Sequence, residues 1–225
     1  MNVNLLTMNS PIIRAPMLRR ALISGVRKVI SQRDRLNKIN VFPVPDGDTG
    51  SNMAFTLGSV LSGALNRKSH SSGDLMRRVS DYAIDGARGN SGAILAQFFT
   101  GISEQIGSNS VTSLEQMSLA IKNGALTARQ ALSQPVEGTI VTVISAFADA
   151  LHLNHEKIHF QQWFEVALCS AKKALANTPN QLAVLQKAGV VDAGGQGFVD
   201  MLEGVYQFIK DGRIDLNDEV ENCNA

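Results

Sequence analysis

Apolar residues recur three or four positions apart along most of the chain, and this spacing constrains the fold more than any other feature. Such a period places the apolar side chains on one face of an α-helix. Alternation at period two is missing, and β-branched residues are not clustered, so we predict an all-α protein. The apolar stripes cover residues 18–30, 53–65, 75–83, 94–102, 114–128, 140–151, 160–175 and 198–209, with a shorter helix over 181–187.

Helices that are apolar on one face bury it most economically against one another, as in a bundle of about eight or nine helices. Hydrophobic residues make up 44% of the 225-residue chain and charged residues 18%, which is typical of a globular protein. No low-complexity linker divides it, so we expect one domain over residues 15–211, with 1–14 as an N-terminal extension and 212–225 as a C-terminal tail.

The composition also limits the setting in which the protein works. The net charge of +1 gives no argument for a nucleic-acid or membrane-surface partner. Cys169 and Cys223 are widely spaced and show no metal-ligand pattern, which fits a reducing compartment. The N-terminus lacks the features of a signal peptide, and no apolar run reaches the roughly 18–20 residues of a membrane span. We therefore predict a cytoplasmic protein.

Many of the glycines lie in four connections, each just before an apolar stripe where a helix should begin. Ser, Thr, Asn and Asp are favoured over glycine at a helix start, so four glycine-rich starts indicate a purpose beyond capping. These connections read "PDGDTGSN", "DGARGNSGA", "PVEGTI" and "GVVDAGGQG".

The first connection has the chemistry of a cation site beside an anion site. Asp46 and Asp48 flank a glycine, so a tight loop can turn both carboxylates toward one hard cation such as Mg²⁺, and Asn40 can add a carbonyl oxygen. The cap and first turn of the next helix would offer N–H groups to a phosphate, through Thr49, Ser51 and Asn52. An Asp-Gly turn with no ligand explains the same residues, and both interpretations are open. The spacing excludes an EF-hand.

The other three connections are less specific when each is taken alone. "GARGNSGA" exposes backbone N–H groups, and Asn90 and Ser91 can cap a helix or donate to phosphate, but the stretch is neither a Walker A loop nor a nucleophile elbow. Arg88 can contact a phosphate or form a salt bridge. Thr139 and Asp192 are explained as helix caps, and Gly194 and Gly195 would allow close approach of a ligand or of another backbone segment.

A zinc-protease pattern also occurs. "HEKIH", residues 155–159, matches H-E-x-x-H, in which two histidines one helical turn apart share a metal. That chemistry needs a helix and a third ligand, whereas this stretch falls in a polar gap between two predicted helices. We interpret it as a solvated loop.

Taken in order, the motifs "NVFPVPDGDTGSNM", "GARGNSGAILAQ", "PVEGTIVTV" and "AGVVDAGGQGF" resemble the ATP-binding domain of bacterial fatty acid kinase. That domain belongs to the nucleotide-binding (L-subunit) family of dihydroxyacetone kinase. The resemblance covers about residues 15–211 and implies an antiparallel helical barrel whose loops at one end bind ATP or ADP with Mg²⁺.

The resemblance also implies roles for individual residues. Asp46 and Asp48 would ligate Mg²⁺, with Asn40 as the third ligand. Phosphates would be held at the first loop by Thr49, Ser51 and Asn52, and at the second by Asn90, Ser91 and Gly92. Thr139 and the loop from Asp192 to Gly195, including Gly194, would close around the nucleotide.

The implied reaction transfers the γ-phosphoryl group of ATP to a fatty acid, giving an acyl phosphate. The acyl chain would be presented by a separate fatty-acid-binding protein of the DegV-like family. No catalytic side chain is assigned, because a carboxylate acceptor is already a nucleophile and needs no general base. Two alternatives are a dihydroxyacetone-kinase-like subunit for a small substrate and a nucleotide-sensing module without turnover.

Members of the fatty acid kinase family usually continue into a middle domain and a C-terminal partner-binding domain, whereas this chain ends at "DEVENCNA". We therefore expect either a portion of a longer protein or a domain that relies on partners in trans, with nucleotide binding retained in both cases. A homodimer is a further assembly that a longer chain would allow.

Overall fold

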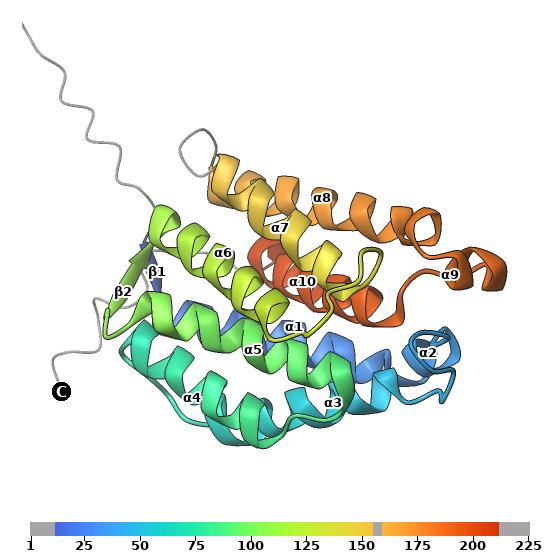
Figure 1. The fold of residues 1–225 in the computed structure, drawn as a ribbon. Coiled ribbons are helices and arrows are strands. Elements are labelled where there is room, and N and C mark those ends of the chain that lie inside the picture. Colours follow the sequence, from blue (N-terminus) through green and yellow to red (C-terminus); the bar gives the residue numbers. More distant parts are fainter. Residues whose placement is uncertain (1–11, 155–158, 212–225) are drawn as a thin grey trace, which may run out of the picture.

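The computed structural model describes residues 12–154 and 159–211, and eight long helices in this part of the chain form a closed barrel (Figure 1). Each helix packs against the one before it and the one after it, and the last packs against the first. The predicted all-α fold, an antiparallel helical barrel, is thereby confirmed. The helices are α1 Ala15–Ser31, α3 Thr49–Ser59, α4 Ser72–Asp85, α5 Gly89–Ile106, α6 Leu114–Gln130, α7 Ile140–Asn154, α8 Phe160–Gln181 and α10 Ala193–Asp211.

Several short elements complete the described part of the chain, and the sequence predicted only one of them. The predicted short helix over 181–187 is α9, which spans Ala183–Ala188. Periodicity did not indicate the two antiparallel strands, because three residues are too few to show alternation. The elements that were not predicted are the strands β1 Ile12–Arg14 and β2 Val111–Ser113, the helix α2 Arg33–Lys38 and a π-helical turn, Val60–Ala64, that continues α3.

Aromatic side chains pack edge to face in the interior of the barrel. The ring of Phe198 lies 5.4 Å from that of Phe98 and 6.0 Å from that of Phe147, with interplanar angles of 90° and 78°. These rings come from α10, α5 and α7, so they join helices on different sides of the ring. Edge-to-face contacts of this kind add to the free energy gained by burying the rings.

Two glycines let the first and last helices of the barrel approach closely. A Cβ atom on Gly25 of α1 would lie 2.7 Å from the carbonyl oxygen of Met201, and one on Gly204 of α10 would lie 2.6 Å from that of Ser24. Any larger residue would force α1 and α10 apart. The barrel is therefore closed by backbone contact between its two ends in sequence.

Within residues 12–154 and 159–211, no helix combines the length and the apolarity that crossing a membrane requires. Residues 155–158 of the "HEKIH" stretch, most of the predicted N-terminal extension and the predicted C-terminal tail lie outside the described residues.

Candidate functional site

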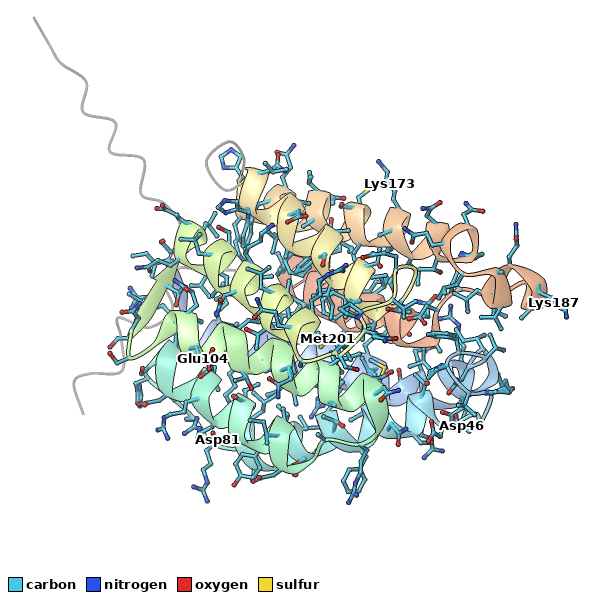
Figure 2. All side chains as sticks on the ribbon, viewed as in Figure 1. Asp46, Asp81, Glu104, Lys173, Lys187 and Met201 are labelled. Atoms are coloured by element: carbon cyan, nitrogen blue, oxygen red, sulfur yellow. The ribbon has the colours of Figure 1, made fainter. Side chains whose placement is uncertain are left out.

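The up-and-down arrangement brings the four glycine-rich connections to one end of the barrel. Because successive helices run in opposite directions, α3, α5, α7 and α10 all begin at the end where α2 and α9 lie (Figure 1). Each of these four helices follows one of the glycine-rich connections. Figure 2 shows Asp46, from the first connection, at this same end.

A pocket of about 460 Å³ lies among these helix starts. It brings together most of the residues singled out from the sequence. The predicted site residues in its lining are Asn40, Asp46, Asp48, Thr49, Asn52, Asn90, Ser91, Thr139, Asp192 and Gly194.

The lining also contains residues that the sequence did not single out. One group follows α6, at residues 132–136, and another lies at residues 42–44, just before the acidic loop. Residues 42–44 are all apolar, whereas the group after α6 mixes apolar and polar residues, and each group contains or borders a proline. The sequence did carry a signal for some of them, because residues 42–44 belong to the motif "NVFPVPDGDTGSNM" and Val136 to "PVEGTIVTV". Residues 132–134 carry neither charge nor a motif, so nothing in the sequence indicated them.

The two acidic side chains of the first connection are exposed and unpaired. Asp46 lies in the loop between α2 and α3, and Asp48 is the residue just before α3 but makes no capping hydrogen bond. Neither carboxylate has a hydrogen-bond or ion-pair partner among the described residues. The part of the chain that the structure describes contains no group of three or more His, Cys, Asp and Glu side chains that could hold a metal. The site therefore offers two free carboxylates and must complete a cation's shell with other oxygens.

Two asparagines close the start of α3 from outside. Oδ1 of Asn40 accepts hydrogen bonds from the backbone N–H of Thr49, at 3.0 Å, and from its hydroxyl, at 2.6 Å. Oδ1 of Asn37, on α2, accepts the N–H of Ser51 at 3.0 Å, and its Nδ2 donates to the Ser51 hydroxyl at 2.9 Å. The expectation that the first turn of α3 offers free N–H groups is therefore wrong for Thr49 and Ser51.

Three predicted nucleotide-binding residues do not line the pocket. Ser51 is turned toward Asn37, so both of its polar groups are already hydrogen-bonded. Gly92 lies against Thr56, and Gly195 donates its N–H to the carboxylate of Asp192. In the structure these three residues contact neighbouring segments at the helix starts and do not line the pocket.

The start of α5 is open, in contrast to that of α3. Gly89 has a positive φ of 58°, which a residue with a side chain adopts only with strain. The residue before it, Arg88, forms no side-chain cap, and its guanidinium lies 4.7 Å from the centroid of the exposed Phe55 ring. The first-turn N–H groups of Gly89, Asn90 and Ser91 therefore have no capping partner among the described residues, and these three residues line the pocket. An uncapped helix start of this kind suits an anion.

Asp192 ties the starts of α7 and α10 together. Its Oδ2 accepts the N–H of Gly195 at 2.7 Å, and its carboxylate also accepts the N–H of Ile140. Burial raises the pKa of Asp192 from 3.8 to about 6, although the two N–H groups act in the opposite direction by favouring the charged form. Nearby, the hydroxyl of Thr139 donates to the carbonyl oxygen of Val136 at 2.7 Å, which holds the loop before α7.

The helices form a closed ring with this pocket at one end, and sequence comparison shows the family to which such a chain belongs. The DAK2 domain family matches residues 43–207, and the chain belongs to this family.

Two relatives that are more than a third identical in sequence are considerably longer proteins. An uncharacterized protein of Staphylococcus haemolyticus is 38% identical over 202 residues, which is 89% of this chain and 37% of that protein. An uncharacterized protein of Staphylococcus aureus strain USA300 is 37% identical over 195 residues, which is 86% of this chain and 36% of that protein. The chain thus spans little more than a third of the length of these relatives.

Among solved structures, the dihydroxyacetone kinase of C. freundii has a similar fold. Its native form matches with a TM-score of 0.65 and 17% identity, over 92% of this chain and 37% of that one. The same kinase in complex with AMP-PNP and Mg²⁺ matches with a TM-score of 0.66 and 16% identity, over the same shares of the two chains. At this level of identity the likeness establishes the helical fold.

Proposed function

We propose that this chain is the ATP-binding domain of a kinase that transfers the γ-phosphoryl group of ATP to a fatty acid, with Mg²⁺ as cofactor. The acceptor would be presented by a separate fatty-acid-binding protein of the DegV-like family, and the reaction would take place in the cytoplasm. The product would be an acyl phosphate.

One observation carries the nucleotide part of this proposal. Two unpaired carboxylates, Asp46 and Asp48, and the uncapped start of α5 line the same pocket. The carboxylates attract a cation, whereas free N–H groups at a helix start attract an anion. A magnesium–nucleotide complex presents both charges side by side, so it satisfies both halves of the pocket at once.

The donor set fits Mg²⁺ bound mainly through the nucleotide. This ion is usually held by one or two carboxylates together with water and substrate phosphates, and two free carboxylates are what the pocket provides. Oδ1 of Asn40 accepts both the N–H and the hydroxyl of Thr49, so Asn40 would join Asp46 and Asp48 only by giving up at least one of these hydrogen bonds. When bound there, Mg²⁺ would offset the charge of the phosphates.

The remaining residues of the pocket bind and orient. The N–H groups of Asn90 and Ser91, together with their side chains, would hold phosphate oxygens, and Asn52 would contact them from α3. Thr139 and Gly194 would border the rest of the nucleotide, at the helix starts that Asp192 holds together. Fixed donors of this kind stabilise a phosphoryl group in transfer without rearranging.

The acceptor is proposed from the family resemblance and agrees with the chemistry of the site. No catalytic side chain is assigned, because a fatty acid carboxylate is already a nucleophile and requires no general base. Positioning of the acceptor and neutralisation of charge can then account for catalysis.

A second candidate is a nucleotide-binding subunit that serves a small hydroxyketone such as dihydroxyacetone. The fold likeness to the dihydroxyacetone kinase of C. freundii favours it. The staphylococcal relatives carry long additional regions. The acceptor of the whole protein would be determined by those regions as well as by this domain.

Titration calorimetry with AMP-PNP and Mg²⁺ tests the nucleotide site. We expect binding by the wild type and a loss of at least about tenfold in affinity for Asp48→Asn, because one charged ligand of the ion is removed. Asp81→Asn is the matched control, since Asp81 is an exposed aspartate of α4 outside the pocket (Figure 2). Equal affinities for Asp48→Asn and the control would refute the assignment.

Parallel turnover assays separate the acceptors. The chain is incubated with ATP and either a fatty-acid-loaded binding protein or dihydroxyacetone, and acyl phosphate is trapped with hydroxylamine. Hydroxamate formation supports the fatty acid as acceptor, and dihydroxyacetone phosphate supports the second candidate. Binding of nucleotide without either product would favour the sensing module.

A further inference from the structure

One buried hydroxyl group connects α3, which follows the two carboxylates of the pocket, with α5, whose first turn offers free N–H groups. Thr56 lies on α3 and is fully buried, with a relative exposure of 0%. Its Oγ1 donates to the carbonyl oxygen of Asn52, one turn earlier, at 2.9 Å. The same oxygen accepts the backbone N–H of Arg88 at 3.1 Å. The hydroxyl therefore links α3 to the residue that immediately precedes α5.

The start of α5 is seated directly on this face of α3. A Cβ atom on Gly92 would lie 2.3 Å from Oγ1 of Thr56, and one on Gly89 would lie 2.4 Å from Nδ2 of Asn52. The two glycines thus make room for side chains from successive turns of α3. Thr56 itself does not line the pocket, so it touches no ligand there.

We propose that Thr56 is a positioning residue for anion binding at the start of α5. By accepting the N–H of Arg88 it fixes the backbone just before the Gly89 turn, and thereby aims the N–H groups of Asn90 and Ser91 into the pocket. The proposal rests on the proposed function, in that the anion is the phosphate chain of a magnesium-bound nucleotide.

The hydroxyl, rather than the bulk of the side chain, carries this role. Thr56→Val keeps the shape of the residue and removes both hydrogen bonds, so the N–H of Arg88 loses its acceptor and the Gly89 turn is free to shift. Thr56→Ser keeps the hydroxyl and removes only a methyl group. The two variants therefore separate positioning from packing.

The chain offers a matched control in α5. Oγ1 of Thr100 also donates to the carbonyl oxygen one turn earlier, that of Ala96, at 2.9 Å, and it also pairs with a neighbouring helix, through the Ser80 hydroxyl at 2.9 Å. It lies outside the pocket lining. Thr100→Val thus removes equivalent hydrogen bonds from the barrel without touching the start of α5.

The first experiment is calorimetric titration of AMP-PNP with Mg²⁺ into the four proteins, each shown to be folded by circular dichroism. We expect about tenfold weaker binding for Thr56→Val, corresponding to the loss of one aligned donor set, and near-wild-type binding for Thr56→Ser and Thr100→Val. Unchanged binding by folded Thr56→Val would overturn the proposal. So would an equal loss in Thr56→Ser, because the methyl group and not the hydroxyl would then matter.

Hydrogen exchange in the absence of nucleotide tests the same residue independently of the proposed function. The amide of Arg88 should exchange faster in Thr56→Val than in Thr100→Val, while amides in the interior of α5 exchange at similar rates in both. Equal exchange at Arg88 would refute the positioning role. If the wild type bound no nucleotide but the amide of Arg88 still exchanged faster in Thr56→Val, the proposed function would be refuted. The positioning of the Arg88 backbone by Thr56 would then still stand.

Discussion

Two helices that start away from the pocket, α4 and α6, differ from two that start beside it, α3 and α5, in how their first N–H groups are capped. At the end away from the pocket, α4 and α6 are each capped by their own preceding serine. Ser71 accepts the N–H of Asp74, and Ser113 forms a reciprocal capping box with Gln116. At the pocket end, neither α3 nor α5 is capped by the residue before it. Uncapped starts also occur away from the pocket, at α1 and α8, and α10 at the pocket end is capped by Asp192. What distinguishes α5 is that its uncapped first turn borders the pocket, where its N–H groups remain open to a ligand.

The pocket at the glycine-rich end and the cavity in the other half of the barrel differ in the polarity of their lining. The pocket at the glycine-rich end holds about 460 Å³ and mixes carboxylates, amides and hydroxyls with apolar groups. A smaller cavity of about 110 Å³ is surrounded only by apolar side chains, among them Phe98, Met117 and Trp163. These come from β1, α1, α4, α5, α6, α7, α8 and α10. The barrel thus keeps its polar donors at one end and its largest rings away from them.

The largest expected effect concerns Asp192, the buried tie at the pocket end. Its pKa is about 6 in the folded protein, against 3.8 for an ordinary aspartate, so the folded state holds a proton that the unfolded state releases between these values. The contribution of Asp192 to stability is therefore fully present well below pH 4 and falls as the pH rises to about 6. The fall amounts to about 3 kcal/mol, since each pKa unit is worth about 1.4 kcal/mol.

Urea unfolding of the wild type and of Asp192→Asn, between pH 4 and pH 7.5, measures this contribution. Asparagine does not titrate, so the difference in unfolding free energy between the two proteins should decline by about 2.5 kcal/mol over this range, since the rest of the fall lies below pH 4, and stay level above pH 6.5. Asp200, whose pKa burial also raises, is present in both proteins and cancels if the two sites act independently. A difference that does not vary with pH would show that Asp192 is ionised throughout.

Removing a cap at the opposite end should have a smaller effect that does not depend on pH. Ser113→Ala deletes the hydroxyl that accepts the N–H of Gln116 at 3.1 Å and leaves the start of α6 unsatisfied. We expect a loss of about 1 kcal/mol in unfolding free energy and unchanged affinity for AMP-PNP with Mg²⁺. Weaker nucleotide binding in this variant would contradict the expectation that the cap of α6 stabilises the fold without affecting the pocket.

The fold could be predicted from the sequence because each barrel helix carries its own apolar stripe. The stripes over 94–102 and 114–128, for example, lie within α5 and α6. Residues 53–65 were predicted as one helix, but α3 ends at Ser59 and a π-helical turn follows, which periodicity does not distinguish from an α-helix. The helix α2 was missed because its sequence, RDRLNK, contains a single apolar residue, Leu36, and therefore shows no stripe.

The site could be predicted only where the residue types themselves, such as paired aspartates or clustered glycines, indicate a ligand. The pairing of Asp46 with Asp48, and the glycines before α5, indicated a ligand, and both line or border the pocket. Asn37 was not predicted, and Asn40 was interpreted as a metal ligand, because the hydrogen bonds that these asparagines make depend on how α2 meets α3. Such contacts between separate segments leave no trace in local spacing.

The sharpest test of the comparison is to give α5 the kind of cap that α4 and α6 possess. Arg88 already has the extended backbone of a capping residue, with φ −131° and ψ 134°. A serine there can accept the free N–H of Ser91, whereas an alanine cannot. Both substitutions also remove the guanidinium and its contact with Phe55, so Arg88→Ala is the matched control for Arg88→Ser.

We expect Arg88→Ser to exceed Arg88→Ala in unfolding free energy by about 0.5–1 kcal/mol, the usual value of a cap, and to bind AMP-PNP with Mg²⁺ a few times more weakly. The two changes have one cause, because the N–H group that the serine satisfies is the one withheld from the phosphate. Urea unfolding and calorimetry measure them on the same samples. A variant that gained stability and lost no affinity would show that the open start of α5 does not hold the anion, and that α5 differs from α4 and α6 for another reason.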